Sequence, residues 1–164
     1  MSLLYCKEKT LANDSGFIGF EVAEFSPSLF KVYLEGEKHN FKTTFVRLYF
    51  QLMTFGKAKL FCALDEFGKV THTSYVVPKC FKFSFLKKGD YIIGPCYTKA
   101  EHRGKGIYPQ MLGYICSNVG SKSTVFYMSV DENNFPSVKG IEKAGFKNCG
   151  TVKKTRLFKR YKRD

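Results

Sequence analysis

Strand-like and helix-like hydrophobic spacings alternate through the second half of the chain. Residues 91–98 and 124–130 are short apolar runs that predict strands, and residues 136–144 predict a short helix that Gly145 ends. Between the strands, three- and four-residue spacing predicts a helix with Pro109 in its first turn, and its apolar face carries Tyr108, Met111, Leu112, Ile115 and Val119. From Phe146 the chain returns to extended structure, so the order is strand, glycine loop, helix, strand, helix, strand.

The first half contains one helix pattern and one hairpin pattern. From about Asn40 the spacing predicts a helix that ends near Gly56, and we expect its core-facing side to carry Phe41, Phe45, Leu48, Tyr49 and Leu52. Residues 57–64 and 70–77 are predicted strands, and the Asp-Glu-Phe-Gly sequence at 65–68 has the composition of a tight turn. We therefore expect these two strands to form a hairpin.

Length and composition fit one folded domain. With 164 residues, 44% apolar residues and 14 glycines, the chain is neither disordered nor collagen-like. It has no run of about 18 uncharged apolar residues and no apolar signal-peptide core, so we expect a cytoplasmic protein without a membrane partner. The six cysteines lack zinc-ligand spacing, which predicts reduced thiols and no metal. We expect a single domain over residues 1–164, as a monomer or a homodimer.

The chain is strongly basic, with 27 Lys and Arg against 14 Asp and Glu and a formal net charge of +13. Residues 153–164 supply six of these charges. We expect this segment to form a solvated edge strand, with a role in holding an anionic substrate as the alternative. Its charges alternate with Val152, Leu157, Phe158 and Tyr161. The overall charge predicts an anionic partner: nucleic acid, an anionic membrane surface or a phosphate-rich small ligand.

The junction after the predicted strand 91–98 has the properties of an anion site. Gly94 and Pro95 predict a bulge or break in that strand, because proline cannot donate a ladder hydrogen bond. The sequence Arg-Gly-Lys-Gly at 103–106 then leads into the next helix, whose first N–H groups lack intrahelical partners. This spacing differs from both the Walker A and the dinucleotide-binding patterns.

Two motifs about thirty residues apart resemble a known family. The first reads Thr-Lys-Ala-Glu-His-Arg-Gly-Lys-Gly-Ile-Tyr at 98–108, and the second reads Asn-Phe-Pro-Ser-Val-Lys-Gly-Ile-Glu-Lys-Ala-Gly-Phe at 134–146. Together they resemble the GCN5-related N-acetyltransferase (GNAT) family. There, the first segment holds the pyrophosphate of acetyl-coenzyme A and the second flanks its pantetheine arm. The resemblance covers about residues 91–149, which it identifies as the acetyl-coenzyme A-binding half.

The resemblance implies a fold and a set of binding residues. The fold would be mixed α/β: one domain with a central, strongly twisted mixed sheet of about six or seven strands flanked by helices. Backbone groups at 96–98 would pair with pantetheine and polarise the acetyl carbonyl, and N–H groups at 103–108 would bind the pyrophosphate. The residues implied to bind acetyl-coenzyme A are Cys96, Tyr97, Thr98, Arg103, Gly104, Lys105, Gly106, Ile107, Tyr108, Asn134 and Ser137.

The chain departs from the family pattern at two positions. Tyr108 replaces the last small residue of the loop, and Ile141 stands where many members carry a tyrosine that protonates the departing thiolate. Isoleucine cannot donate a proton, so another residue takes this role or it is not used; Tyr127 and Cys96 are the nearest candidates.

The catalytic residues stay open. A general base is needed because an amine attacks only when it is unprotonated, and none of the candidates stands out: His72, Asp90, Tyr97, Glu101, Tyr127, Asp131 and Glu132. Cys96 could alternatively accept the acyl group as a nucleophile, although no histidine is near it in sequence.

The predicted function is transfer of acetyl from acetyl-coenzyme A directly to a primary amine. The acceptor is not identified; a nucleotide-linked amino sugar or another small amine fits. The alternative is a non-catalytic, basic nucleic-acid-binding domain, which would explain the charge and the 17 Phe and 10 Tyr. Because these aromatic residues lie mostly in periodic core patterns, we do not expect a nucleic-acid partner.

Overall fold

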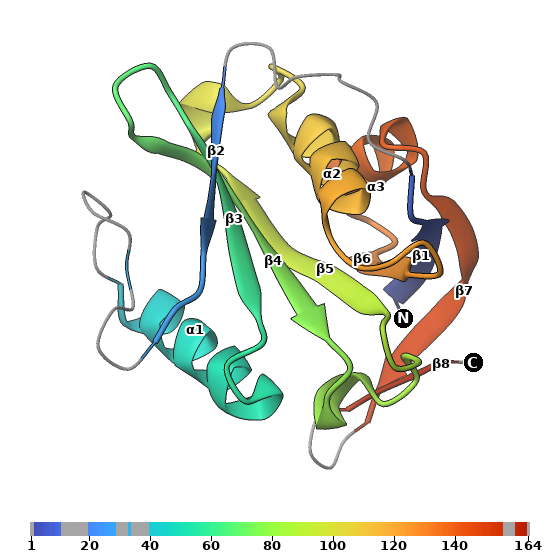
Figure 1. Ribbon diagram of the computed structural model, residues 1–164. Helices are drawn as coiled ribbons and strands as arrows, with labels where there is room; N and C mark the ends of the chain where they lie inside the picture. Colours follow the sequence, from blue (N-terminus) through green and yellow to red (C-terminus); the bar gives the residue numbers. More distant parts are fainter. Residues whose placement is uncertain (1, 11–19, 29–32, 34–39, 156–159, 164) are drawn as a thin grey trace.

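The protein folds around one mixed β-sheet. The computed structural model describes residues 2–10, 20–28, 33, 40–155 and 160–163. The strand order is β2-β3-β4-β5-β6-β1-β7-β8, and within this sheet β5 and β6 pair in parallel while the other neighbours are antiparallel (Figure 1). The strands are β1 (Ser2–Glu8), β2 (Glu21–Phe25), β3 (Lys59–Leu64), β4 (Val70–Pro78), β5 (Tyr91–Thr98), β6 (Val125–Asp131), β7 (Lys147–Lys154) and β8 (Tyr161–Arg163). The predicted mixed α/β fold is confirmed, with eight strands among the described residues where six or seven were expected.

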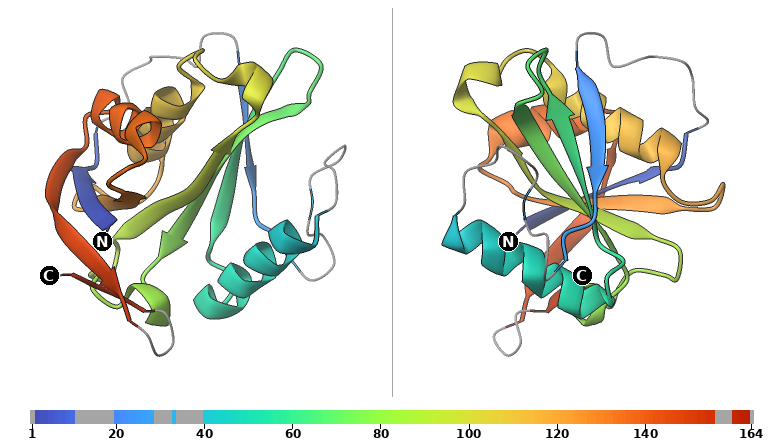
Figure 2. Two further views of the ribbon diagram at one scale, coloured as in Figure 1. Left: turned by 180° about the vertical axis from the view of Figure 1, so that it is seen from behind. Right: turned by 60° about the vertical axis from the view of Figure 1, so that its left-hand side comes forward.

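Among the described residues, three α-helices cover the two faces of this sheet. They are α1 (Phe41–Thr54), α2 (Ile107–Asn118) and α3 (Phe135–Lys143), and two short 3₁₀ turns, η1 (Phe81–Phe83) and η2 (Ala100–His102), flank β5. Alternate side chains of β3 lie on opposite faces of the sheet. Phe61 packs into the core under α2 and α3, whereas Leu60 packs into the core that includes Phe50 of α1. Figure 2 shows α1 well separated from the α2 and α3 pair. No helix in the described residues is long and apolar enough to span a membrane.

The predicted hairpin is confirmed. Strands β3 and β4 pair along their length, and the turn between them is held by the Asp65 carboxylate, which accepts hydrogen bonds from the backbone N–H groups of Phe67 and Lys69 at 3.0 and 2.8 Å. Gly68 completes the turn with a φ of 72°, a conformation that favours glycine. The helix and strand order predicted for the second half is also confirmed.

Strand β5 carries the predicted bulge and then leaves its parallel neighbour. Against β4, Ser74 pairs with Cys96 but Val76 pairs with Ile93, so the register shifts at Gly94 and Pro95. Against β6, β5 pairs only through Tyr91 and Ile92. The two strands therefore diverge after Ile92, and the backbone of residues 96–98 is free of ladder bonds on the β6 side.

The predicted buried face of α1 is wrong. Phe41, Phe45 and Leu52 are 86, 64 and 71% exposed, whereas the buried positions of the helix are Arg47, Phe50 and Thr54. This face can bury an arginine because the Arg47 Nε donates to the Tyr75 hydroxyl at 3.2 Å and its guanidinium lies over the rings of Phe25 and Tyr33. Leu48 and Tyr49 are half-buried.

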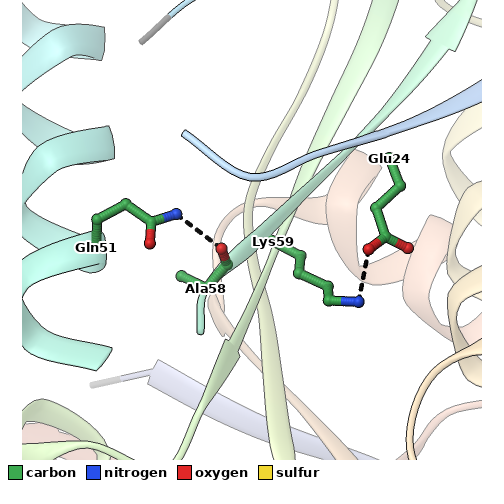
Figure 3. A network of polar contacts seen from close by, with 4 residues as sticks. All are labelled: Glu24, Gln51, Ala58 and Lys59. Atoms are coloured by element: carbon green, nitrogen blue, oxygen red, sulfur yellow. Dashed lines mark hydrogen bonds and ion pairs between the residues drawn. The ribbon is translucent and has the colours of Figure 1, made fainter. Parts of the chain in front are cut away.

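Side-chain contacts fix the C-terminal end of α1 and the edge strand β2. Figure 3 shows Gln51 of α1 donating to the carbonyl of Ala58, just before β3, at 2.8 Å. It also shows the ion pair between Lys59 of β3 and Glu24 of β2. The first contact holds the end of α1 beside the start of β3, and the second joins β3 to β2.

The C-terminal segment ends in the predicted edge strand. Strand β8 pairs with β7 at the edge of the sheet, and the Tyr161 ring packs 5.2 Å from that of Phe83 in η1. Leu157 and Phe158 lie outside the described residues. The six cysteines are free thiols: Cys62 and Cys116 are buried, and the other four are half-buried.

Candidate active site

The junction between β5 and α2 has the backbone geometry of an anion site. Gly104 and Gly106 have φ values of 77° and 74°, and Gly106 caps α2 without a side chain. The N–H groups of the first turn of α2 and the positive end of the helix dipole point toward the loop. No side chain caps these N–H groups, and no acidic residue in the first turn offsets their partial positive charge. Arg103 is anchored beside them, because its Nε donates to the Thr98 carbonyl at 3.1 Å.

A cavity of about 770 Å³ opens below this loop. Its walls come from β5, the glycine loop, the start of α2, the end of β6 and α3. Lys105, one of the residues implied to bind acetyl-coenzyme A, does not line it. The ten implied residues that do are Cys96, Tyr97, Thr98, Arg103, Gly104, Gly106, Ile107, Tyr108, Asn134 and Ser137.

A second cavity of about 700 Å³ lies between α1, η1 and the C-terminal strands. Both cavities are lined by Ile93, Gly94, Pro95 and Ser129, the residues at the divergence of β5 and β6. We name them the loop cavity and the α1 cavity. A ligand in one can therefore meet a ligand in the other at this divergence.

Four polar side chains form a hydrogen-bonded chain along β4 and β5. The Ser74 hydroxyl donates to the Cys96 sulfur at 3.2 Å, and the His72 ring bonds Ser74 through Nε2 and Thr98 through Nδ1, both at 2.7 Å. We call these residues the relay. The structure thus places a histidine one hydroxyl away from Cys96, although the two are 24 positions apart in the sequence.

Hydrogen counting fixes the direction of the relay. Because the single Ser74 hydroxyl hydrogen points to Cys96, Nε2 of His72 carries a hydrogen that it donates to Ser74. Burial lowers the pKa of His72 to about 4, so the ring is neutral and its Nδ1 accepts from the Thr98 hydroxyl. The thiol hydrogen of Cys96 is then left for the loop cavity.

Comparison with known proteins identifies the fold. No protein-family model and no curated protein sequence matches the chain. A GNAT-family acetyltransferase from Colwellia psychrerythraea matches 90% of this chain and 52% of its own, at 19% identity and a TM-score of 0.57. A tandem GNAT protein from the clavulanic acid biosynthesis pathway matches 90% of this chain and 50% of its own, at 14% identity and a TM-score of 0.55.

A third solved structure is similar over nearly its whole length. Glucosamine-6-phosphate N-acetyltransferase from Arabidopsis thaliana matches 85% of this chain and 98% of its own, at 18% identity and a TM-score of 0.51. The chain has the GNAT fold. It spans about half the length of the first two structures.

Within this GNAT fold, the two departures from the family motifs lie next to each other. The Tyr108 ring is 5.8 Å from the His72 ring, and a Cβ added at Gly140 would lie only 2.5 Å from Tyr108 Cδ1. Ile141 is 1% exposed in the core. Tyr108 thus packs closely on α3 beside the position that lacks the family's tyrosine, and burial raises its pKa, with a smaller contribution from Cys96.

The second-motif residues sit at the start of α3. The Asn134 side chain caps this helix by accepting from the Ser137 N–H at 3.3 Å. Its oxygen is therefore engaged, and the Nδ2 amide is the group left to donate to a ligand.

The other candidate acids and bases are placed away from the relay. Tyr127 packs against Phe85 at 5.7 Å and lines neither cavity, and Glu101 and Glu132 are exposed. The Asp90 carboxylate accepts from the N–H groups of Lys87 and Val125 and has a structural role.

Two candidates border the loop cavity without joining the relay. Asp131 binds the Asn133 N–H through its carboxylate at 2.9 Å. Tyr97 is 59% exposed, and its ring lies 5.9 Å from the Arg103 guanidinium. In the described residues, no group of three or more His, Cys, Asp or Glu side chains could hold a metal ion.

Ser74 was missed by the sequence analysis, and Thr98 was considered only for its backbone. One signal was available: His72 and Ser74 are two apart on one strand, as are Cys96 and Thr98 on the next, so each pair shares a face. The register that joins the pairs, Ser74 to Cys96 and His72 to Thr98, depends on strand pairing across the bulge.

Proposed function

We propose that this chain is an acetyl-coenzyme A-dependent N-acetyltransferase that transfers acetyl directly to the primary amine of a small acceptor. One observation carries the proposal: a helix N-terminus without a capping or acidic side chain opens onto a cavity that meets a second cavity where β5 and β6 diverge. A donor and an acceptor can then be bound together. The GNAT fold is consistent with this activity.

The residues of the loop cavity fit the chemistry of coenzyme A. N–H groups of residues 103–108 would hold the pyrophosphate, with Arg103 beside them. The backbone groups of residues 96–98 on the side away from β4 would bind the pantetheine amides. The same backbone would polarise the acyl carbonyl through an N–H aimed at its oxygen. When bound, acetyl-coenzyme A supplies an activated acetyl thioester.

We assign the proton donor for the leaving thiolate to Cys96, in place of the tyrosine that Ile141 replaces. Burial raises the Cys96 pKa to about 12, so the thiol stays protonated at neutral pH and is a poor nucleophile. As Cys96 donates, Ser74, His72 and Thr98 can each pass one hydrogen in the same direction along the relay. Thr98, which lines the loop cavity, takes a hydrogen from water in turn, so the proton given to the thiolate is replaced and no member keeps a charge that burial would penalise.

The acceptor amine has to lose its own proton separately. We propose that solvent removes it, because the four residues that line both cavities include no carboxylate, and the Asp131 carboxylate, which borders the loop cavity, already accepts from the Asn133 N–H. The acceptor stays open at this point: a nucleotide-linked amino sugar or another small amine is compatible with the basic surface.

Thermal unfolding with and without ligand tests the proposal against the nucleic-acid alternative. Acetyl-coenzyme A should raise the melting temperature with increasing concentration, because a ligand that binds only the folded state stabilises it by mass action. Single-stranded RNA at matched phosphate concentration should not. Stabilisation by RNA and none by acetyl-coenzyme A would favour the nucleic-acid-binding domain.

A further inference from the structure

The α1 cavity has a distinct chemical character. Its volume of about 700 Å³ is in the range of small-molecule sites. Five aromatic side chains line it, contributed by α1, η1 and β8: Phe45, Tyr49, Phe50, Phe83 and Tyr161. Such rings suit a flat or branched apolar body better than a sugar covered with hydroxyls.

The charges in this cavity are of one sign. Lys82 and Lys154 line it, and no acidic side chain does so among the described residues. The Lys82 Nζ lies 5.0, 5.2 and 5.7 Å from the ring centroids of Tyr49, Phe50 and Phe83. The Lys154 Nζ is 5.9 Å from the ring of Tyr161. Lys82 is half-buried against these rings, so water screens its charge less than that of an exposed lysine.

The position of the cavity decides which end of a ligand enters the reaction. The shared residues Ile93, Gly94, Pro95 and Ser129 form its boundary with the loop cavity, so the nucleophilic amine must lie there. The rest of the acceptor then lies among the rings and lysines. Two lysine charges also disfavour a protonated amine, and so favour the neutral form that attacks.

We propose that the acceptor is a small primary amine that carries an aromatic or branched apolar body and an anionic group, a carboxylate or a phosphate. This inference rests on the proposed acetyltransferase function. The rings bind the body, and Lys82 and Lys154 bind the anion. The same two lysine charges disfavour polyamines and other dications.

A set of amines on one scaffold separates these requirements. Release of free thiol from acetyl-coenzyme A is measured with para-(aminomethyl)benzoate, its neutral carboxamide, para-xylylenediamine and the ring-free ε-aminocaproate. Tyramine O-phosphate against tyramine tests phosphate as the anion. We expect kcat/KM for the benzoate to exceed that for the carboxamide by about tenfold or more, with the diamine lowest. The ring-free acid should fall below the benzoate.

Lysine-to-methionine variants test the assigned anion site, since methionine keeps an unbranched apolar stem. Lys82→Met with Lys154→Met should reduce the ratio of acid to carboxamide about fivefold or more. Lys88→Met, an exposed lysine outside the cavity, is the matched control and should keep the wild-type ratio. Melting temperatures of all variants confirm that they are folded.

The outcomes distinguish this inference from the proposed function. A wild-type ratio of one or less, an unchanged ratio in the double variant, or no acetylation of any amine while acetyl-coenzyme A still stabilises the protein would overturn the acceptor class. Failure of acetyl-coenzyme A to bind at all would instead overturn the acetyltransferase proposal.

Discussion

The contact between Tyr108 and Gly140 makes a sharp prediction about a single methyl group. In Gly140→Ala, the new Cβ would lie 2.5 and 2.8 Å from two carbons of the Tyr108 ring. Carbon atoms normally approach to about 3.5–4.0 Å, so ring and helix must separate by roughly 1 Å. Overpacking of this kind costs about 1–3 kcal/mol, and the better helix propensity of alanine returns about 0.5–1 kcal/mol. We therefore expect the free energy of unfolding to fall by about 1 kcal/mol.

Gly113→Ala in α2 is the matched control, because that helical glycine has no atom within 4 Å of the added Cβ. It should stabilise the protein by about 0.5–1 kcal/mol in urea unfolding, so that the two variants differ by the overpacking cost. Removing the ring with Tyr108→Ala should make Gly140→Ala neutral or stabilising. Equal stability of the two alanine variants, or an unchanged penalty without the ring, would refute this packing.

Three further predictions concern the relay. Cys96→Ala should lower kcat by about 10²-fold, while its affinity for acetyl-coenzyme A stays within about threefold of the wild type. Cys96→Ser should retain more activity than Cys96→Ala. Full activity of Cys96→Ala would show that Cys96 is not the proton donor. Since burial holds the pKa of His72 at about 4 against 6.5 in the unfolded chain, its contribution to stability is complete above pH 6.5 and is lost as the pH falls toward 4. His72→Gln should flatten this loss in urea unfolding at a series of pH values, and an unchanged slope would contradict a neutral ring. Finally, initial-rate plots at fixed amine concentrations should intersect, and labelled acetyl-coenzyme A alone should leave no acetyl group on Cys96; parallel lines with labelled Cys96 would indicate a covalent route.

Local signals explain why the second half was predictable. Strand β5 and helix α3 lie where the hydrophobic spacing, Pro136 and Gly145 predict them. Both kinds of signal, the spacing and the residues that start or end a helix, depend only on neighbours within about a dozen residues. The bulge at Gly94 and Pro95 followed from the missing proline N–H. The order of the strands and helices around the glycine loop could therefore be predicted without knowing any long-range contact.

Long-range pairing explains what was missed. Strand β1 lies between β6 and β7, which are more than a hundred residues away in sequence. No local sequence pattern predicts that these strands pair. In α1 the regular apolar stripe predicted the wrong face, because Arg47 could be buried only once Tyr75 and the rings of Phe25 and Tyr33 were beside it. The relay required the pairing register of β4 with β5, which also lies outside local reach.

The most direct test of the central claim is the affinity for acetyl-coenzyme A, measured by isothermal titration calorimetry on two glycine variants. Gly104 in the anion loop and Gly68 in the β3–β4 turn have φ values of 77° and 72°, and neither has an atom within 4 Å of an added Cβ. Gly104→Asp should weaken binding at least about tenfold, or about 1.4 kcal/mol, because it places a carboxylate against the pyrophosphate. Gly68→Asp should bind like the wild type. Equal affinity of the two folded variants would contradict an acetyl-coenzyme A site at residues 103–108.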